Sequence, residues 1–158
     1  MAPGNDQRLV LPSPMSLHFC VTAPSNTGKT SFLCQMIETL VHNGYKVGAI
    51  KSCHHLIQSN DSGKDSQKLS MAGADPVLSI ANNENVEEYF HHFSHTDICL
   101  IEGGRKSELP AVVLYRTEHP FDPKWTKPKN ILMHLDISNP QAAVQKMLLW
   151  IEQHIQET

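Results

Sequence analysis

Short apolar runs alternate along the chain with segments in which apolar residues recur every three or four positions. The runs have the length of strands and cover residues 17–22, 46–51, 76–81, 97–102, 111–115 and 131–135. The segments between several of these runs have the period of amphipathic helices. Strands that alternate with helices are typical of a parallel sheet with crossover helices. The pattern therefore predicts an α/β fold in which helices cover both faces of a mostly parallel central sheet.

Two of the predicted helices have long apolar stripes. The first follows the strand at 17–22 and ends near Gly44, because glycine commonly stops a helix. The last begins with Asn139 as its cap and Pro140 at its first helical position. The expected buried faces contain Phe32, Leu33, Met36, Ile37, Leu40 and Val41 in the first helix, and Val144, Met147, Leu148, Ile151 and Ile155 in the last.

Two shorter helices are predicted between them. Asp65 or Ser66 would cap one of these, after a long polar loop over 52–63, and Gly73 would stop it. Asn82 or Asn83 would cap the other. The apolar positions expected on their buried sides are Leu69, Met71 and Ala72 in the former, and Val86, Tyr89, Phe90 and Phe93 in the latter.

The run from Asp97 to Glu102 is apolar throughout its centre, as in a parallel strand that is buried on both faces. We expect it in the middle of the sheet. Glu102 ends this strand, whereas Asp97 begins it and so lies at the opposite edge, where we expect a structural role.

Composition narrows the class of protein. Apolar residues make up 40% of the 158 residues and charged residues 18%, with a formal net charge of −3, as in ordinary globular proteins. We expect a flexible leader over 1–15 and a single domain over 16–158, with no nucleic-acid partner. Apolar runs fall short of the roughly 20 residues that cross a bilayer, so no membrane partner is expected. Four scattered cysteines without a secretion signal favour reduced thiols and a cytoplasmic location.

The segment between the first strand and the first helix matches a phosphate-binding loop. Its pattern is GxxxxGK followed by Ser or Thr, and residues 23–30 supply all of it except the first glycine, which is Ala23. In such loops backbone N–H groups surround the phosphates at the helix N-terminus, the lysine adds a positive charge, and the hydroxyl binds Mg²⁺. The alternative is a capped turn with no ligand. We predict that a nucleoside triphosphate binds Ser25, Asn26, Thr27, Gly28, Lys29, Thr30 and Ser31.

Glu102 is the candidate catalytic carboxylate. It ends a predicted central strand at the carboxyl edge of the sheet, where ligands bind in open α/β folds. There it would hold Mg²⁺ together with Thr30, or position an attacking water. The alternative is a surface carboxylate at a strand end.

A second group of polar residues leaves the next strand at the same edge. It consists of Lys51, His54 and His55, followed by Gly63, Lys64 and Asp65. We expect both segments to frame one site. The two lysines are either anion contacts or solvated. Cys53 with the two histidines offers metal ligands, but adjacent residues of an extended chain point in opposite directions, so a complete site needs ligands from elsewhere. Arg105 and Lys106 are candidate contacts to phosphate or to a partner protein.

The order of these motifs resembles the molybdopterin-guanine dinucleotide biosynthesis protein B (MobB) family. After the phosphate loop come Gly48-Ala49-Ile50-Lys51, His54-His55, Gly63-Lys64-Asp65-Ser66, Ala72-Gly73-Ala74 and Ile101-Glu102-Gly103. The resemblance covers residues 17–116 and implies a three-layer P-loop NTPase fold.

The resemblance also implies a function. Members of the family bind GTP with Mg²⁺, form dimers, hydrolyse GTP weakly at most, and assist the guanylyltransferase MobA in attaching GMP to molybdopterin. By this resemblance, Gly28, Lys29 and Thr30 would hold phosphate and Mg²⁺, and Glu102 would serve the metal or water. The residues expected to line the second part of the site are Lys51, His54, His55, Gly63, Lys64 and Asp65.

Two features of the sequence bear on activity, and the first is a departure from the family pattern. Residues 56–60 lack the aspartates usual after the histidine pair, so we expect hydrolysis weaker than in other members. An NKxD guanine-recognition motif is missing as well, because residues 126–129 lack the aspartate. Two alternatives therefore stay open: an ATP-dependent small-molecule kinase or ligase on the same fold, and a metal-delivery GTPase that uses Cys53, His54 and His55.

Overall fold

The computed structural model describes residues 17–24, 27–53, 60–81, 84–104, 107–118 and 124–156. Its strands are all parallel and form one six-stranded sheet in the order β3-β2-β4-β1-β5-β6. The predicted α/β fold is confirmed. The strands are β1 (Leu17–Thr22), β2 (Val47–Cys53), β3 (Val77–Ala81), β4 (Ile98–Glu102), β5 (Pro110–Tyr115) and β6 (Asn130–Asp136).

The two strands that carry the phosphate loop and Glu102 lie at the centre of the sheet. β4 is buried at every position and pairs with β1, so that Glu102 lies beside Val21. On its other edge β4 pairs with β2, which places Lys51 beside Glu102. Asp97, just before β4, accepts a hydrogen bond from the Lys46 backbone N–H at 2.8 Å. Its role is structural, as expected for the opposite edge of the sheet.

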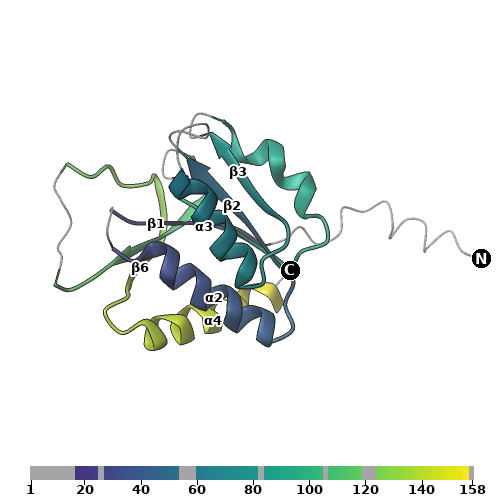
Figure 1. Cartoon of the computed structure of the whole chain (residues 1–158). Coiled ribbons are helices and arrows are strands. Elements are labelled where there is room, and N and C mark those ends of the chain that lie inside the picture. The colour runs from purple at the N-terminus through teal and green to yellow at the C-terminus, as the bar shows by residue number, and fades with distance from the viewer. Residues whose placement is uncertain are drawn as a thin grey trace, which may run out of the picture.

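Three α-helices pack on one face of the sheet (Figure 1). They are α2 (Lys29–His42), α3 (Asn60–Met71) and α4 (Pro140–Gln156). Their apolar stripes meet alternate residues of the strands, such as Phe19 and Leu100, in the larger of two cores. Asn139 caps α4 as predicted, because its Oδ1 accepts a hydrogen bond from the Ala142 N–H at 3.2 Å. None of the described helices has the length and apolar character needed to cross a membrane.

A short 3₁₀ helix, η1 (Val86–Phe93), covers the opposite face. Val86 and Phe93 are buried and Tyr89 and Phe90 pack beside them, so the predicted stripe is confirmed. Phe93 occupies the space that a Cβ at Gly48 of β2 would need. This contact brings η1 directly onto the sheet backbone.

The cap predicted for this helix is wrong. Asn85 caps η1 by accepting a hydrogen bond from the Glu87 N–H at 3.0 Å, in place of Asn82 or Asn83. The reason is distance along the chain, since a cap must directly precede the first helical residue. Asn82 and Asn83 lie outside the described residues.

The start of α3 and two apolar positions also differ from the prediction. The helix begins at Asn60, so Asp65 and Ser66 lie within it instead of capping it, and the long polar loop ends earlier than residue 63. Met71 is 81% exposed because it lies two positions after the buried Leu69, which places it about 200° around the helix. Val41 is likewise exposed at the margin of the α2 stripe.

Candidate phosphate-binding site

The candidate site begins where β1 passes into α2. Gly28 directly precedes α2 in a left-handed conformation with φ of +94°, and no side chain caps the helix. The first hydrogen bond of the helix runs from the Phe32 N–H to the Gly28 carbonyl at 3.0 Å. Because a helix N-terminus without a side-chain cap can offer its first N–H groups to an anion, this end of α2 is a candidate phosphate site.

The described part of the loop is held by two hydrogen bonds to backbone carbonyls. The Thr27 hydroxyl donates to the Pro24 carbonyl at 2.6 Å. Arg116, just after β5, donates from Nε to the Thr27 carbonyl at 2.7 Å. Ser25 and Asn26 lie outside the described residues, and Ser31 is exposed on α2.

Thr30 and Glu102 are in direct contact. The Thr30 hydroxyl donates to Glu102 Oε1 at 2.9 Å, and Glu102 is only 3% exposed. Glu102 is therefore not the surface carboxylate of the alternative interpretation. Its other oxygen, Oε2, is buried without a hydrogen-bond donor among the described residues. A hydroxyl beside a buried carboxylate oxygen is a ligand set that suits Mg²⁺, which prefers oxygen ligands.

Lys51 joins this pair to α3. Its Nζ lies 2.8 Å from Asp65 Oδ2 and 3.5 Å from Glu102 Oε2, and its side chain is 13% exposed. The interpretation of Lys51 as a solvated lysine is wrong, because two carboxylates partly enclose it. The predicted meeting of the segments around Lys51 and Asp65 is confirmed, while Lys64 points to solvent.

The remaining residues of the second group are only partly described. Gly63, Lys64 and Asp65 belong to α3, so the predicted loop over 52–63 does not extend to Gly63. His54, His55, Arg105 and Lys106 lie outside the described residues, as does the side chain of Cys53. Within the described ranges, no group of three or more His, Cys, Asp and Glu residues has the arrangement of a metal site. The described cysteines, Cys20, Cys34 and Cys99, are free thiols.

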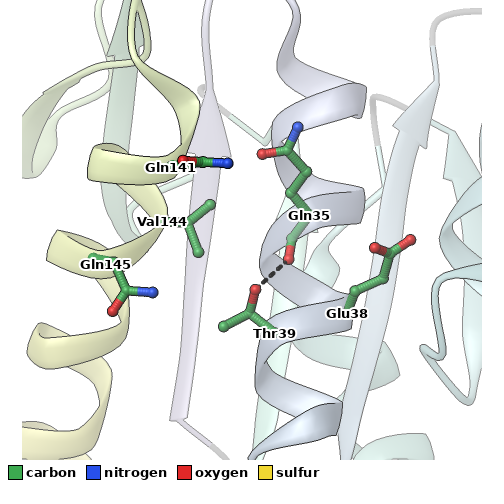
Figure 2. Close-up of a pocket in the computed structure, with 6 residues that line it drawn as sticks. All are labelled: Gln35, Glu38, Thr39, Gln141, Val144 and Gln145. Atoms are coloured by element: carbon green, nitrogen blue, oxygen red, sulfur yellow. Dashed lines mark hydrogen bonds between the residues drawn. The ribbon is translucent and has the colours of Figure 1, made fainter.

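A separate cavity of about 410 Å³ lies between α2 and α4 (Figure 2). One of its lining residues, Thr39, donates its hydroxyl to the Gln35 carbonyl within α2 at 2.8 Å. The lining contains no basic side chain, so the cavity is not suited to a triphosphate. Its residues are Gln35, Glu38, Thr39, Gln141, Val144 and Gln145.

Sequence reasoning missed Arg116. Its only local signal is that it follows an apolar run, as many surface residues do. Its contact with the loop depends on β5 lying beside β1, and strand order is not a local property of the sequence.

Comparison with known proteins identifies the family. Residues 18–135 match the model of the family described as "Molybdopterin guanine dinucleotide synthesis protein B". The chain belongs to the MobB family. The family resemblance of the motif series is thereby confirmed.

Two curated relatives of this MobB-family chain are each called "Molybdopterin-guanine dinucleotide biosynthesis adapter protein". The protein from Haemophilus influenzae is 30% identical over 112 residues, which cover 62% of each chain. The protein from Escherichia coli is 32% identical over 107 residues, which cover 58% of this chain and 61% of that protein. The MobB-family chain thus spans about three fifths of the length of these relatives.

Solved MobB structures share the fold. A MobB homolog from Bacillus stearothermophilus superposes with a TM-score of 0.53 at 14% identity, over 86% of this chain and 98% of that one. Bacillus subtilis MobB gives a TM-score of 0.51 at 19% identity, over 85% and 97%. At these identities the likeness supports the P-loop NTPase fold of the family and nothing finer.

Proposed function

We propose that this chain is a GTP-binding adapter in the biosynthesis of molybdopterin guanine dinucleotide. The proposal rests on one observation above all: the uncapped N-terminus of α2 lies beside the contact between Thr30 and the buried Glu102. The names of its curated relatives supply the pathway. In the adapter role the chain would act as a homodimer in the cytoplasm, with a MobA-like guanylyltransferase as its partner.

The loop and the first turn of α2 would bind the phosphates. Backbone N–H groups near Gly28 would hold the phosphates, and Lys29 would add a positive charge to the outer ones. Ser25, Asn26, Thr27 and Ser31 complete the proposed loop contacts. Bound Mg²⁺ would neutralise phosphate charge, held by the Thr30 hydroxyl and by Glu102.

The surroundings of Glu102 favour binding over turnover. Oε1 accepts a hydrogen bond from Thr30, and Oε2, which has no hydrogen-bond donor among the described residues, lies 3.5 Å from the positively charged Lys51 Nζ. A carboxylate held in this way is better placed to ligate a cation than to take a proton from water. We therefore propose weak hydrolysis at most.

The test is a calorimetric titration of the full chain with GTP and ATP, with and without Mg²⁺. Tight GTP binding is expected in the wild type and should be lost in Lys29→Ala. Lys146→Ala removes the same charge from an exposed position on α4 and should bind normally. In Glu102→Gln the gain in affinity from Mg²⁺ should disappear.

A clear preference for ATP would contradict the proposal and favour a small-molecule kinase or ligase. Binding of neither nucleotide would also contradict it. If GTP binds, the adapter role is tested by capture of a purified guanylyltransferase of the same pathway, which should require the bound nucleotide.

A further inference from the structure

Arg116 is tied to the phosphate loop although it comes from a different strand. Its Nε–H donates to the Thr27 carbonyl at 2.7 Å. Its Nη2 lies 2.9 Å from the position that a Cβ would take on Gly28. The guanidinium therefore rests against the part of the loop that leads into α2, and the missing side chain of Gly28 makes room for it.

Arg116 approaches the loop from the side opposite to the proposed cation. β1 lies between β4 and β5 in the sheet. The Thr30 hydroxyl is turned toward Glu102 on β4, so the cation and the outer phosphates belong on that side. A nucleotide held in this direction would extend its sugar and base away from β4, toward the carboxyl ends of β5 and β6. Arg116 directly follows β5 and contacts the loop, so it lies on the side where the sugar and base would be.

Among the described residues, only the Nε–H of Arg116 has a hydrogen-bond acceptor. The Nε–H donates to the Thr27 carbonyl. The two Nη groups carry four further N–H donors, and these have no acceptor in the part of the chain that the structure describes. Asp136 interacts with the charge of Arg116, but its carboxylate accepts its hydrogen bonds from other groups. Its Oδ2 accepts from the Thr117 hydroxyl at 2.8 Å and its Oδ1 from the Ser138 N–H at 2.9 Å.

The two Nη groups of an arginine in this position would bind guanine better than adenine. Guanine presents two neighbouring acceptors, O6 and N7, and arginine binds this pair with two parallel hydrogen bonds. Adenine places an amino donor where guanine has O6, so one N–H of the fork would face another donor. The chain lacks an NKxD motif, and a selecting residue must therefore come from elsewhere.

We propose that Arg116 selects guanine in the nucleotide site: its Nε–H braces the phosphate loop, and its Nη groups bind the O6 and N7 edge of the base. The inference rests on the proposed function, because it requires that the loop binds a purine nucleotide.

The experiment measures the dissociation constants of GTP and ATP with Mg²⁺ for the wild type, Arg116→Met, Arg116→Lys and Lys29→Ala. Methionine keeps the apolar stem of the side chain, and urea unfolding of each variant verifies its fold. Arg116→Met should weaken GTP about tenfold to hundredfold and ATP far less, so that the preference for GTP collapses. Arg116→Lys should not restore the preference, because an ammonium lacks the planar fork. Lys29→Ala should weaken both nucleotides alike, since they share the triphosphate.

Equal losses of GTP and ATP in Arg116→Met would overturn the selection of guanine and leave only the brace on Thr27. Unchanged affinities would overturn both parts of the inference. A wild type that binds neither nucleotide would overturn the proposed function and this inference together, and a wild type that binds both equally would overturn the selection alone.

Discussion

The Nδ1 atom of His18, in β1, is buried and has no hydrogen-bond partner among the described residues. Its ring lies 4.1 Å from that of Phe90 in η1, measured between centroids. Burial lowers the pKa of His18 below its ordinary value of 6.5, and the nearby Glu87 opposes this shift only in part. The folded protein therefore favours the neutral ring.

This burial predicts a loss of stability in mild acid. Below pH 6.5 the unfolded chain takes up a proton at His18 before the folded chain does, so the free energy of unfolding should fall as the pH drops from 6.5 toward the lower folded pKa. Urea unfolding at a series of pH values measures this slope. His18→Phe keeps an aromatic ring against Phe90 and should flatten the slope in that window. An unchanged slope would assign the acid sensitivity to other groups.

Gly28 and Gly44 offer a matched pair of glycines. Both have positive φ, +94° and +90°, but a Cβ at Gly44 would meet nothing within 4 Å, whereas one at Gly28 would meet Arg116. Substitution by alanine should cost about 1–2 kcal/mol of stability at either position because of the backbone strain. Only Gly28→Ala should abolish nucleotide binding in calorimetry. Normal binding by Gly28→Ala would show that the loop tolerates displacement of Arg116.

The described helices differ in whether a side chain accepts a hydrogen bond from the backbone N–H groups at the N-terminus. Asn139 caps α4 and Asn85 caps η1 with a side-chain oxygen. The start of α2 has no such cap and follows Gly28. Of these three helices, α2 is therefore the one whose N-terminus is suited to bind an anion.

Removal of the cap on α4 should destabilise the fold without affecting the site. Asn139→Ala is expected to cost about 0.5–2 kcal/mol, because the Ala142 N–H loses its acceptor. Asn139→Asp keeps an acceptor at the same position and should cost much less. Urea unfolding monitored by circular dichroism gives both values. Equal losses in the two variants would show that the cap contributes little.

The two faces of the sheet have unequal cover. Three α-helices build the larger core on one face, whereas η1 and a few neighbouring side chains build the smaller core on the other. The smaller core depends on Phe93, which is 1% exposed and packs against Gly48. Phe93 is the larger of the two buried side chains that join η1 to the sheet, the other being Val86.

Truncation of that side chain should weaken the whole domain. Phe93→Ala is expected to lower the free energy of unfolding by about 3–5 kcal/mol, the range for a buried phenylalanine that leaves a cavity. Phe90→Ala is the control, because Phe90 is only partly buried in the same helix and should cost clearly less. Urea denaturation measures both. Similar losses would mean that η1 is held by its whole surface and not by Phe93.

Much of this fold follows from local patterns in the sequence. The bounds of β1, the cap of α4, the central position of β4 and the phosphate loop before α2 are all as predicted. Each was predicted from an apolar pattern, a cap or a motif, and all of these lie within a short segment of the sequence. The predictions for Met71 and for the cap of η1 were wrong because both required exact positions. Met71 depended on the rotation of α3 about its axis, and the cap depended on the residue at which η1 begins.

The tertiary structure alone decided which side chains meet. β1 lies between β4 and β5, and only this order brings Glu102 to Thr30 on one side of the loop and Arg116 to Thr27 on the other. Strand order is set by how all the helices and strands bury their apolar faces together, so no short segment carries it. The sequence by itself determined that a phosphate loop is present, and the packing of the sheet determined which residues surround it.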